Sequence, residues 1–193
     1  EKLDGSLGSA ALQTFKGIKY RHDFFWLYAF NFRSPHTEGK TCVFFSIETL
    51  SESGMGYSSH FFKNGKEGTI EYTGTFTKSE VKFSTAEETR KSFNTLHAEV
   101  KNAVGTWPMN YQLIVSDEQS CAVFRVLGEI ENGNGCMVLL SDSVVRDGIP
   151  EACKTIYVKA CDQHNNRFQQ IFTKDCQRSQ FSNVAFPVNK AYS

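Results

Sequence analysis

The sequence predicts an all-β fold, either an antiparallel up-and-down barrel or a sandwich, with one short helix near each end. Three observations predict it: short β-rich segments follow one another along the chain, turn-forming stretches separate them, and helical periodicity is confined to two segments. A chain of 193 residues is the size of one domain and can bury roughly 70% of its unfolded surface. We expect one domain over residues 1–176 and a C-terminal tail over residues 177–193, which is loosely ordered from Ser179 onward.

The first expected strand, residues 23–32, has the sequence DFFWLYAFNF. It is too short for a membrane-spanning helix, which needs about 20 apolar residues. Strand side chains alternate between the two faces of a sheet. Alternation places five aromatic residues on one face: Phe24, Trp26, Tyr28, Phe30 and Phe32. The opposite face carries Phe25, Leu27 and Ala29.

Further strands are expected wherever β-branched and aromatic residues recur between turn signals such as SESGMG, KNGKEG and ENGNG. Their ranges are 41–50, 57–62, 68–77, 80–85, 92–100, 110–116, 121–128 and 135–142, followed by a short one at 168–173. Most connections are short enough for antiparallel hairpins.

Two segments have helical character. The stretch 8–17 precedes the first strand and could form a lid or plug. The stretch 147–163 is the stronger prediction, because Pro150 and Glu151 suit a first helical turn. Its apolar residues then recur along one helical face: Ile149, Cys153, Ile156, Tyr157 and Ala160.

Charge and composition exclude several classes of protein. Twenty-one basic residues balance 21 acidic residues, and without a basic face we expect no nucleic-acid partner. The longest apolar run is 24–30, so no membrane-spanning helix is expected. The chain begins at Glu1 without an apolar leader, which fits a mature chain whose signal peptide has been removed.

The six cysteines favour disulfides and an oxidising compartment, because their number is even and no Cys-x-x-Cys pair suggests a zinc or redox site. They are Cys42, Cys121, Cys136, Cys153, Cys161 and Cys176. Six buried free thiols are the alternative. Spacing alone leaves 15 connectivities open.

The order of eight or so strands, a late helix and a short strand is that of a lipocalin. Residues 10–176 resemble the tick salivary lipocalins, which include the histamine-binding proteins. The resemblance rests on EGKTC (38–42), on Cys121 opening a strand, on the helix start IPEAC (149–153) and on KDC (174–176). It implies an eight-stranded antiparallel up-and-down lipocalin barrel with a short N-terminal helix and the C-terminal helix packed on the outside. It also implies the disulfides Cys42–Cys176 and Cys121–Cys153, with Cys136–Cys161 as in members that have a third bond.

A cysteine bonded to that outer helix must point outward, so its strand neighbours point inward. We expect the aromatic face of residues 23–32 to line the cavity as well, and the face with Phe25 to pack against the helix. The expected ligand-binding residues are Trp26, Tyr28, Phe30, Phe32, Val43, Phe45, Ile47, Tyr72, Gln112, Phe124, Met137 and Leu139. The alternative is that these side chains fill a solid core.

Amine-binding members of the family place acidic side chains inside the barrel. The matching positions here are Gln112, Met137 and Thr75, none of which is acidic. Three glutamates could replace the missing acids but are more typical of solvated strand residues: Glu48, Glu71 and Glu99. We therefore expect a neutral or apolar lipid such as a sterol, fatty acid or eicosanoid. A lipid carboxylate would need an inward cation, and the candidates are Lys82, Arg90 and Lys101.

The resemblance implies a monomeric protein, secreted in saliva, that sequesters a small ligand of host origin and so modulates inflammation or immunity. We expect no cofactor, no metal and no catalysis, since the histidines are scattered and no nucleophile motif is present. One alternative is a binder of histamine or serotonin. Another is an immunomodulator that binds a host immune protein through its outer face or the loops 51–57 and 101–110, with Trp107 as anchor.

Overall fold

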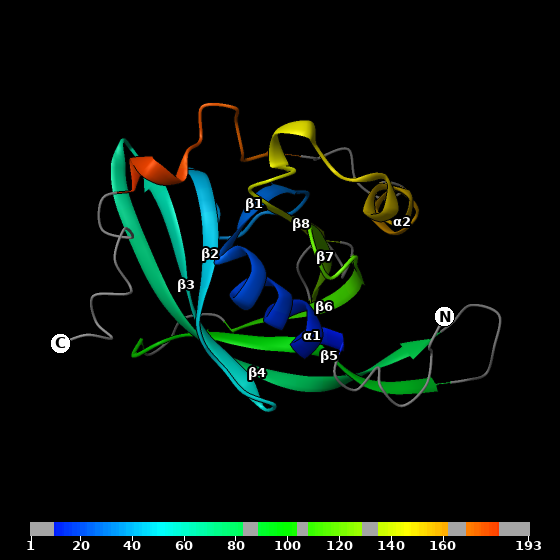
Figure 1. Ribbon diagram of the computed structural model, residues 1–193. Helices are drawn as coiled ribbons and strands as arrows, with labels where there is room; N and C mark the ends of the chain where they lie inside the picture. The colour runs from blue at the N-terminus through cyan, green and yellow to red at the C-terminus, as the bar shows by residue number, and fades with distance from the viewer. Residues whose placement is uncertain (1–9, 83–88, 104–107, 129–134, 162–168, 182–193) are drawn as a thin grey trace.

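The computed structural model describes residues 10–82, 89–103, 108–128, 135–161 and 169–181. Eight antiparallel strands close into a barrel, as Figure 1 shows. They are β1 (Phe24–Phe30), β2 (Lys40–Leu50), β3 (Gly54–Lys63), β4 (Lys66–Lys82), β5 (Thr89–Val100), β6 (Met109–Ser116), β7 (Cys121–Leu127) and β8 (Gly135–Ser141). Strand β1 closes the barrel by pairing with both β8 and β2, and a two-residue strand, β9 (Gln169–Gln170), pairs with the end of β1. The lipocalin-type barrel is confirmed.

One long strand replaces two expected ones. Strand β4 runs without a break from Lys66 to Lys82, whereas separate strands were expected at 68–77 and 80–85. The register of β4 against β5 shifts between Thr77 and Ser79. A β-bulge bends a strand locally without ending it, so the polar residues between the two expected strands do not form a turn.

The helices lie where helical periodicity predicts them. Helix α1 (Ala10–Gly17) continues into a π-helical turn, η2 (Ile18–His22), and lies in front of the barrel opening in Figure 1. A 3-10 turn, η4 (Val145–Asp147), precedes α2 (Glu151–Cys161), which packs on the outer face of β6 and β7. No helix in the described part of the chain is long and apolar enough to span a membrane.

Alternating side chains divide the apolar residues into two clusters. The inner cluster fills the barrel and includes Val43, Ile47, Ala122, Phe124, Val126, Met137 and Leu139. The outer cluster lies between the barrel wall and the C-terminal segments and includes Phe44, Val123, Val138, Tyr157 and Phe172. The inward and outward residues expected from the cysteine positions on β2, β7 and β8 are therefore observed.

All six cysteines are paired, and every bond joins the barrel wall to a C-terminal segment. The disulfides are Cys42–Cys176, Cys121–Cys153 and Cys136–Cys161, as the resemblance implies. The second and third bonds hold the two ends of α2 against β7 and β8. Hydrogen bonding adds to this attachment, because Arg125 on β7 donates to the carbonyl oxygen of Ala160 on α2 at 2.9 Å.

The prediction of which side chains of β1 point into the barrel is wrong for the first half of the strand. Trp26 and Tyr28 belong to the outer side, whereas Phe25 and Leu27 belong to the inner cluster. The pairing of β1 with β8 is irregular between Leu27 and Ala29. This bulge shifts the alternation by one residue, so the following aromatics, Phe30 and Phe32, do point into the barrel.

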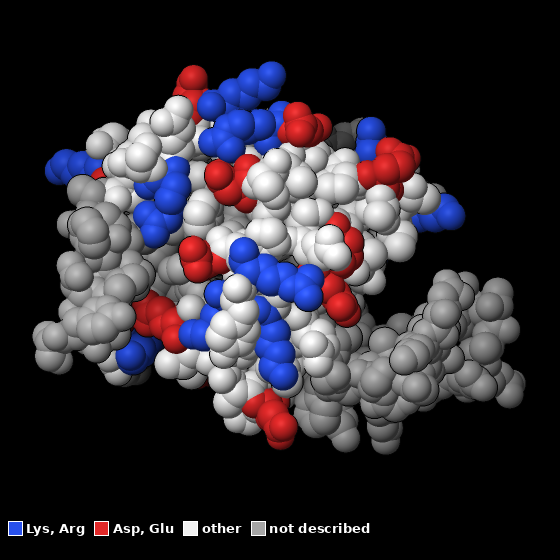
Figure 2. Space-filling view, viewed as in Figure 1, with Lys and Arg blue, Asp and Glu red and all other residues white. Residues whose placement is uncertain are grey.

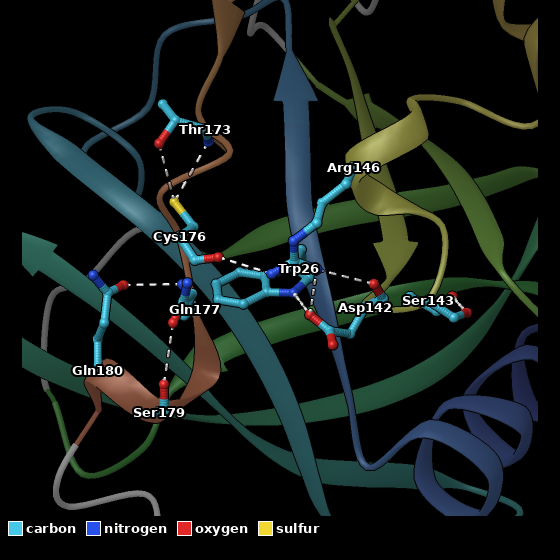
Figure 3. A network of polar contacts seen from close by, with 10 residues as sticks. Trp26, Asp142, Ser143, Arg146, Thr173, Cys176, Gln177, Ser179 and Gln180 are labelled. Atoms are coloured by element: carbon cyan, nitrogen blue, oxygen red, sulfur yellow. Dashed lines mark hydrogen bonds and ion pairs between the residues drawn. The ribbon is translucent and has the colours of Figure 1, made fainter.

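A polar network holds the C-terminal segment on the outer face beside Trp26 (Figure 3). The indole Nε1 donates to Asp142 Oδ1 at 2.8 Å. Arg146 forms an ion pair with the same carboxylate at 3.2 Å and donates to the carbonyl oxygen of Cys176 at 3.1 Å. Trp26 is therefore a buried anchor for this segment.

The first residues of the expected tail are packed against the barrel. A 3-10 turn, η6 (Arg178–Gln180), places Phe181 against Phe44 and Phe62, with ring centroids 4.7 Å and 4.6 Å away. The expectation of loose order is thus wrong as far as Phe181. Residues 182–193 lie outside the described residues.

The face of the molecule that carries α1 mixes both signs of charge. Figure 2 shows blue and red side chains interspersed over it, without an extended patch of one sign. This distribution does not resemble the continuous basic surface that nucleic-acid binding requires.

Candidate ligand-binding site

A partly open cavity lined by aromatic and aliphatic side chains lies inside the barrel, beneath α1 and η2. Its volume is about 40 Å³, which is room for about three water molecules. Side chains from α1, η2 and seven strands line it: Phe15, Ile18, Phe25, Phe45, Ile47, Met55, Tyr57, Leu96, Tyr111, Phe124, Met137 and Leu139. The interior is thus largely filled, although its wall has the composition of a site for an apolar molecule.

Helix α1 closes this end of the barrel. Phe15 points into the interior, where its ring stacks on Phe76 and Phe124 with centroids 6.0 Å and 5.7 Å away. Leu12 and Ile18 flank it in the inner cluster. The helical spacing of these residues follows from the sequence, but their direction does not.

Three tyrosines supply neutral polar groups to the interior. Burial raises the pKa of Tyr57, Tyr72 and Tyr111, so their hydroxyls stay protonated at neutral pH. Tyr57 and Tyr72 stack with their centroids 5.0 Å apart. His36, from the β1–β2 connection, places Nδ1 2.9 Å from the Tyr72 hydroxyl. This contact brings the connection against the barrel interior.

Among the described residues, no acidic side chain lines the cavity. The three candidate glutamates are solvent-exposed, and Glu48 accepts a hydrogen bond from Ser58. Thr75 is exposed as well. The expected inward position of Gln112 is wrong: it is the cross-strand partner of Arg125, so both side chains lie on one face, and the side chain of Arg125 reaches the outer helix. The pairing of β6 with β7 shifts between Leu113 and Val115, so alternation counted from a distant residue is unreliable there.

The structure brings most of the expected ligand-binding residues together. Five line the cavity: Phe45, Ile47, Phe124, Met137 and Leu139. Four more belong to the inner cluster without lining it: Phe30, Phe32, Val43 and Tyr72. Three lie on the outer side: Trp26, Tyr28 and Gln112. Sequence reasoning missed seven lining residues: Phe15, Ile18, Phe25, Met55, Tyr57, Leu96 and Tyr111. Alternation within β3, β5 and β6 could have identified the four residues on those strands, whereas the directions of Phe15, Ile18 and Phe25 could not be determined from pattern.

Of the expected cation candidates, Lys101 alone has a described side chain, and it does not face the cavity. Lys101 is exposed at the end of β5, and the side chains of Lys82 and Arg90 lie outside the described part of the chain. Among the described residues, Lys40, at the start of β2, is a cation that does point inward. Alternation counted from the outward Cys42 would place Lys40 outside. Cys42, however, has a positive φ of 52°, and the register shifts between Thr41 and Phe44, which turns Lys40 inward.

The loops expected to contact a host protein are only partly described. In the stretch 51–57, Met55 and Tyr57 point into the barrel and are unavailable to a partner. Trp107 lies outside the described residues.

Comparison with solved structures shows the lipocalin fold. Lobster apocrustacyanin A1 is 11% identical, with a TM-score of 0.58 over 90% of this chain and 91% of that one. Insecticyanin from the tobacco hornworm Manduca sexta is 11% identical, with a TM-score of 0.59 over 84% and 83%. Japanin from Rhipicephalus appendiculatus, solved bound to cholesterol, is 11% identical, with a TM-score of 0.53 over 80% and 95%.

A comparison with curated protein sequences finds no match. The sequence profile described as tick histamine binding protein matches residues 11–178. That span includes the whole barrel, α2 and all three disulfides, which are bonds typical of extracellular proteins. The chain belongs to the tick histamine-binding protein family and has its lipocalin-type ligand-binding fold.

Proposed function

We propose that this protein is secreted in saliva as a monomer and sequesters a small, mostly apolar host ligand inside its barrel, without turning it over. The observation that carries the proposal is the chemistry of the cavity wall, which consists of apolar side chains and neutral tyrosines. Burial of apolar ligand surface would drive binding, at about 25 cal/mol per Å². Removal of a host lipid mediator would then blunt inflammation or immunity.

The chemistry of the same cavity wall disfavours the binding of histamine and serotonin. A buried ammonium group needs a carboxylate partner, and an unpaired charge costs several kcal/mol. Because the described lining of the cavity has no carboxylate, a bound amine would leave its charge unpaired and would lose that free energy. Each 1.4 kcal/mol is a factor of ten in affinity.

Uptake of a lipid requires side chains to move, since the cavity holds only about 40 Å³. Two contacts are suited to opening. In one, Phe15 rests between two rings; in the other, His36 contacts Tyr72 through a hydrogen bond and an edge-on ring contact. Met55 and Met137 can adapt to a new neighbour, because methionine has a flexible, polarizable side chain.

Titration calorimetry with cholesterol, a fatty acid, histamine and serotonin tests the proposal. Cholesterol belongs in the set because japanin was solved bound to it. We expect at least one lipid to bind at least a hundredfold more tightly than either amine. Tight histamine binding with no lipid binding would overturn the proposal.

The small cavity also favours a second candidate function, in which a filled barrel is a scaffold and the outer surface binds a host immune protein. Exposed apolar side chains on α2, Ile156 and Val158, are available for such a contact. Native mass spectrometry separates the two candidates. A bound small molecule supports sequestration, and a ligand-free barrel that stays empty in the presence of lipids supports the scaffold.

A further inference from the structure

Lys40 holds its ammonium group inside the barrel wall without a hydrogen-bond partner among the described residues. Its side chain is 7% exposed, and Nζ is enclosed. The ammonium lies over the face of Phe61, 3.8 Å from the ring centroid, and Phe61 belongs to the inner cluster. Burial, and after it the charge of Lys63, lower the pKa of Lys40 to about 8.

This environment opposes the positive charge. The ring of Phe61 offers a cation–π contact, but such a contact replaces only part of the hydration that burial removes. A methionine at this position would fill similar space with no charge to bury. A buried polar group that its own chain leaves unpaired indicates a missing partner, and the partner of an ammonium is an anion.

A hollow in the barrel wall gives that anion a place beside Lys40. Strands β1 and β2 pair only over Phe24–Trp26, and farther along β1 its partner is β9. Where β1 and β2 separate, a hollow of about 460 Å³ opens, and Lys40 lines it.

The walls of the hollow are apolar toward the barrel and polar toward solvent. Phe30, Phe32 and Ile171 line it and also belong to the inner cluster. Among the described residues, the charged groups other than Lys40 on its lining are Arg33 and Glu38, and both are exposed. The hollow therefore combines the side chain of one buried cation with aromatic surface, and rotation of Lys40 away from Phe61 would bring its enclosed Nζ to an occupant.

We propose that Lys40 is the head-group site for a single-chain amphiphile with a carboxylate head. The carboxylate pairs with Nζ of Lys40, and the tail lies against Phe30 and Phe32 and enters the barrel. One buried cation balances one negative charge, which matches a carboxylate better than a doubly charged phosphate monoester. The inference rests on the proposed function, because the tail needs the barrel interior.

Two ligands that differ only in the head group test the site. Dodecanoic acid and 1-dodecanol are titrated at pH 7 against the intact protein, Lys40→Met and Lys63→Met. Lys63 is the matched control, because it pairs with Lys40 at the ends of β2 and β3 but is exposed. Binding of the alcohol reports on the barrel, and the melting temperature of each ligand-free variant reports on folding.

The intact protein should bind the acid at least tenfold more tightly than the alcohol. Lys40→Met should lose that tenfold advantage, bind the alcohol unchanged and melt a few degrees higher, since an unpaired buried charge is gone. Lys63→Met should change the acid affinity less than threefold.

If Lys40→Met binds the acid as tightly as the intact protein does, the head-group site is refuted, while sequestration of apolar ligands stands. If the intact protein binds the alcohol but not the acid, the head-group site is refuted in the same way. If the intact protein binds neither these two ligands nor cholesterol, the proposed function itself fails.

Discussion

Replacement of Phe15 by alanine should weaken the fold and improve ligand binding at the same time. Phe15 is 4% exposed and stacks on Phe76 and Phe124. Truncation of a buried phenylalanine costs about 3–5 kcal/mol, which for a domain of this size lowers the melting temperature by roughly 6–20 °C. A ligand would then enter without displacing a ring whose pair contact is worth about 0.5–1.5 kcal/mol, so affinity should rise by up to about tenfold.

Thermal melts followed by circular dichroism and fatty-acid titrations measure the two effects. Phe181→Ala is the matched control, because Phe181 is equally buried but packs against Phe44 and Phe62 on the outer face. It should lose comparable stability and keep its ligand affinity. The reasoning is refuted if Phe15→Ala binds ligand no more tightly, or if both variants change the affinity equally.

Three further predictions concern stability. Burial lowers the pKa of His60 to about 4, so between pH 6.5 and 4 the unfolded chain binds a proton that the native state excludes. The free energy of unfolding should therefore fall by about 3 kcal/mol as the pH drops from 6.5 to 4. Urea denaturation at several pH values should show a smaller fall for His60→Gln. Replacement of Cys42 and Cys176 by alanine opens a loop with a sequence separation of 134 and should cost about 5 kcal/mol in the same assay. Thr14→Val should stabilise the protein by about 1 kcal/mol, because the Thr14 hydroxyl is buried without a partner among the described residues.

Each of these three predictions would be contradicted by a specific result. Equal pH dependence with and without His60 would mean that the imidazole is solvated. Loss of under 1 kcal/mol on removal of the Cys42–Cys176 bond would mean that the reduced chain stays compact when unfolded. Destabilisation by Thr14→Val would mean that the hydroxyl has a partner, such as a buried water molecule.

The barrel strands and the C-terminal helix follow from local patterns in the sequence. Alternation next to a cysteine is reliable over a few residues, which is why Phe124 beside Cys121 and Met137 beside Cys136 point inward as expected. The pairing of the cysteines came from the family resemblance, since spacing alone leaves it open.

The errors in side-chain direction share one physical cause, which is irregular register. Trp26 lies outside because alternation in β1 changes at a bulge after Leu27. Lys40 lies inside because the chain takes a positive φ at Cys42. Neither the bulge after Leu27 nor the positive φ at Cys42 coincides with a glycine or proline. The sequence pattern therefore could not show that Lys40 is buried in the barrel wall.

Methyl NMR of the methionines tests most directly whether ligand binds inside the barrel. The chain has three methionines, and Met55, Met109 and Met137 all belong to the inner cluster. With ¹³C-labelled methionine methyl groups, a fatty-acid titration should produce saturable shifts of the Met55 and Met137 signals, since both line the cavity, and a smaller shift of Met109. A calorimetric binding isotherm for the same acid with all three signals unmoved would place the ligand outside the barrel and contradict sequestration in its interior.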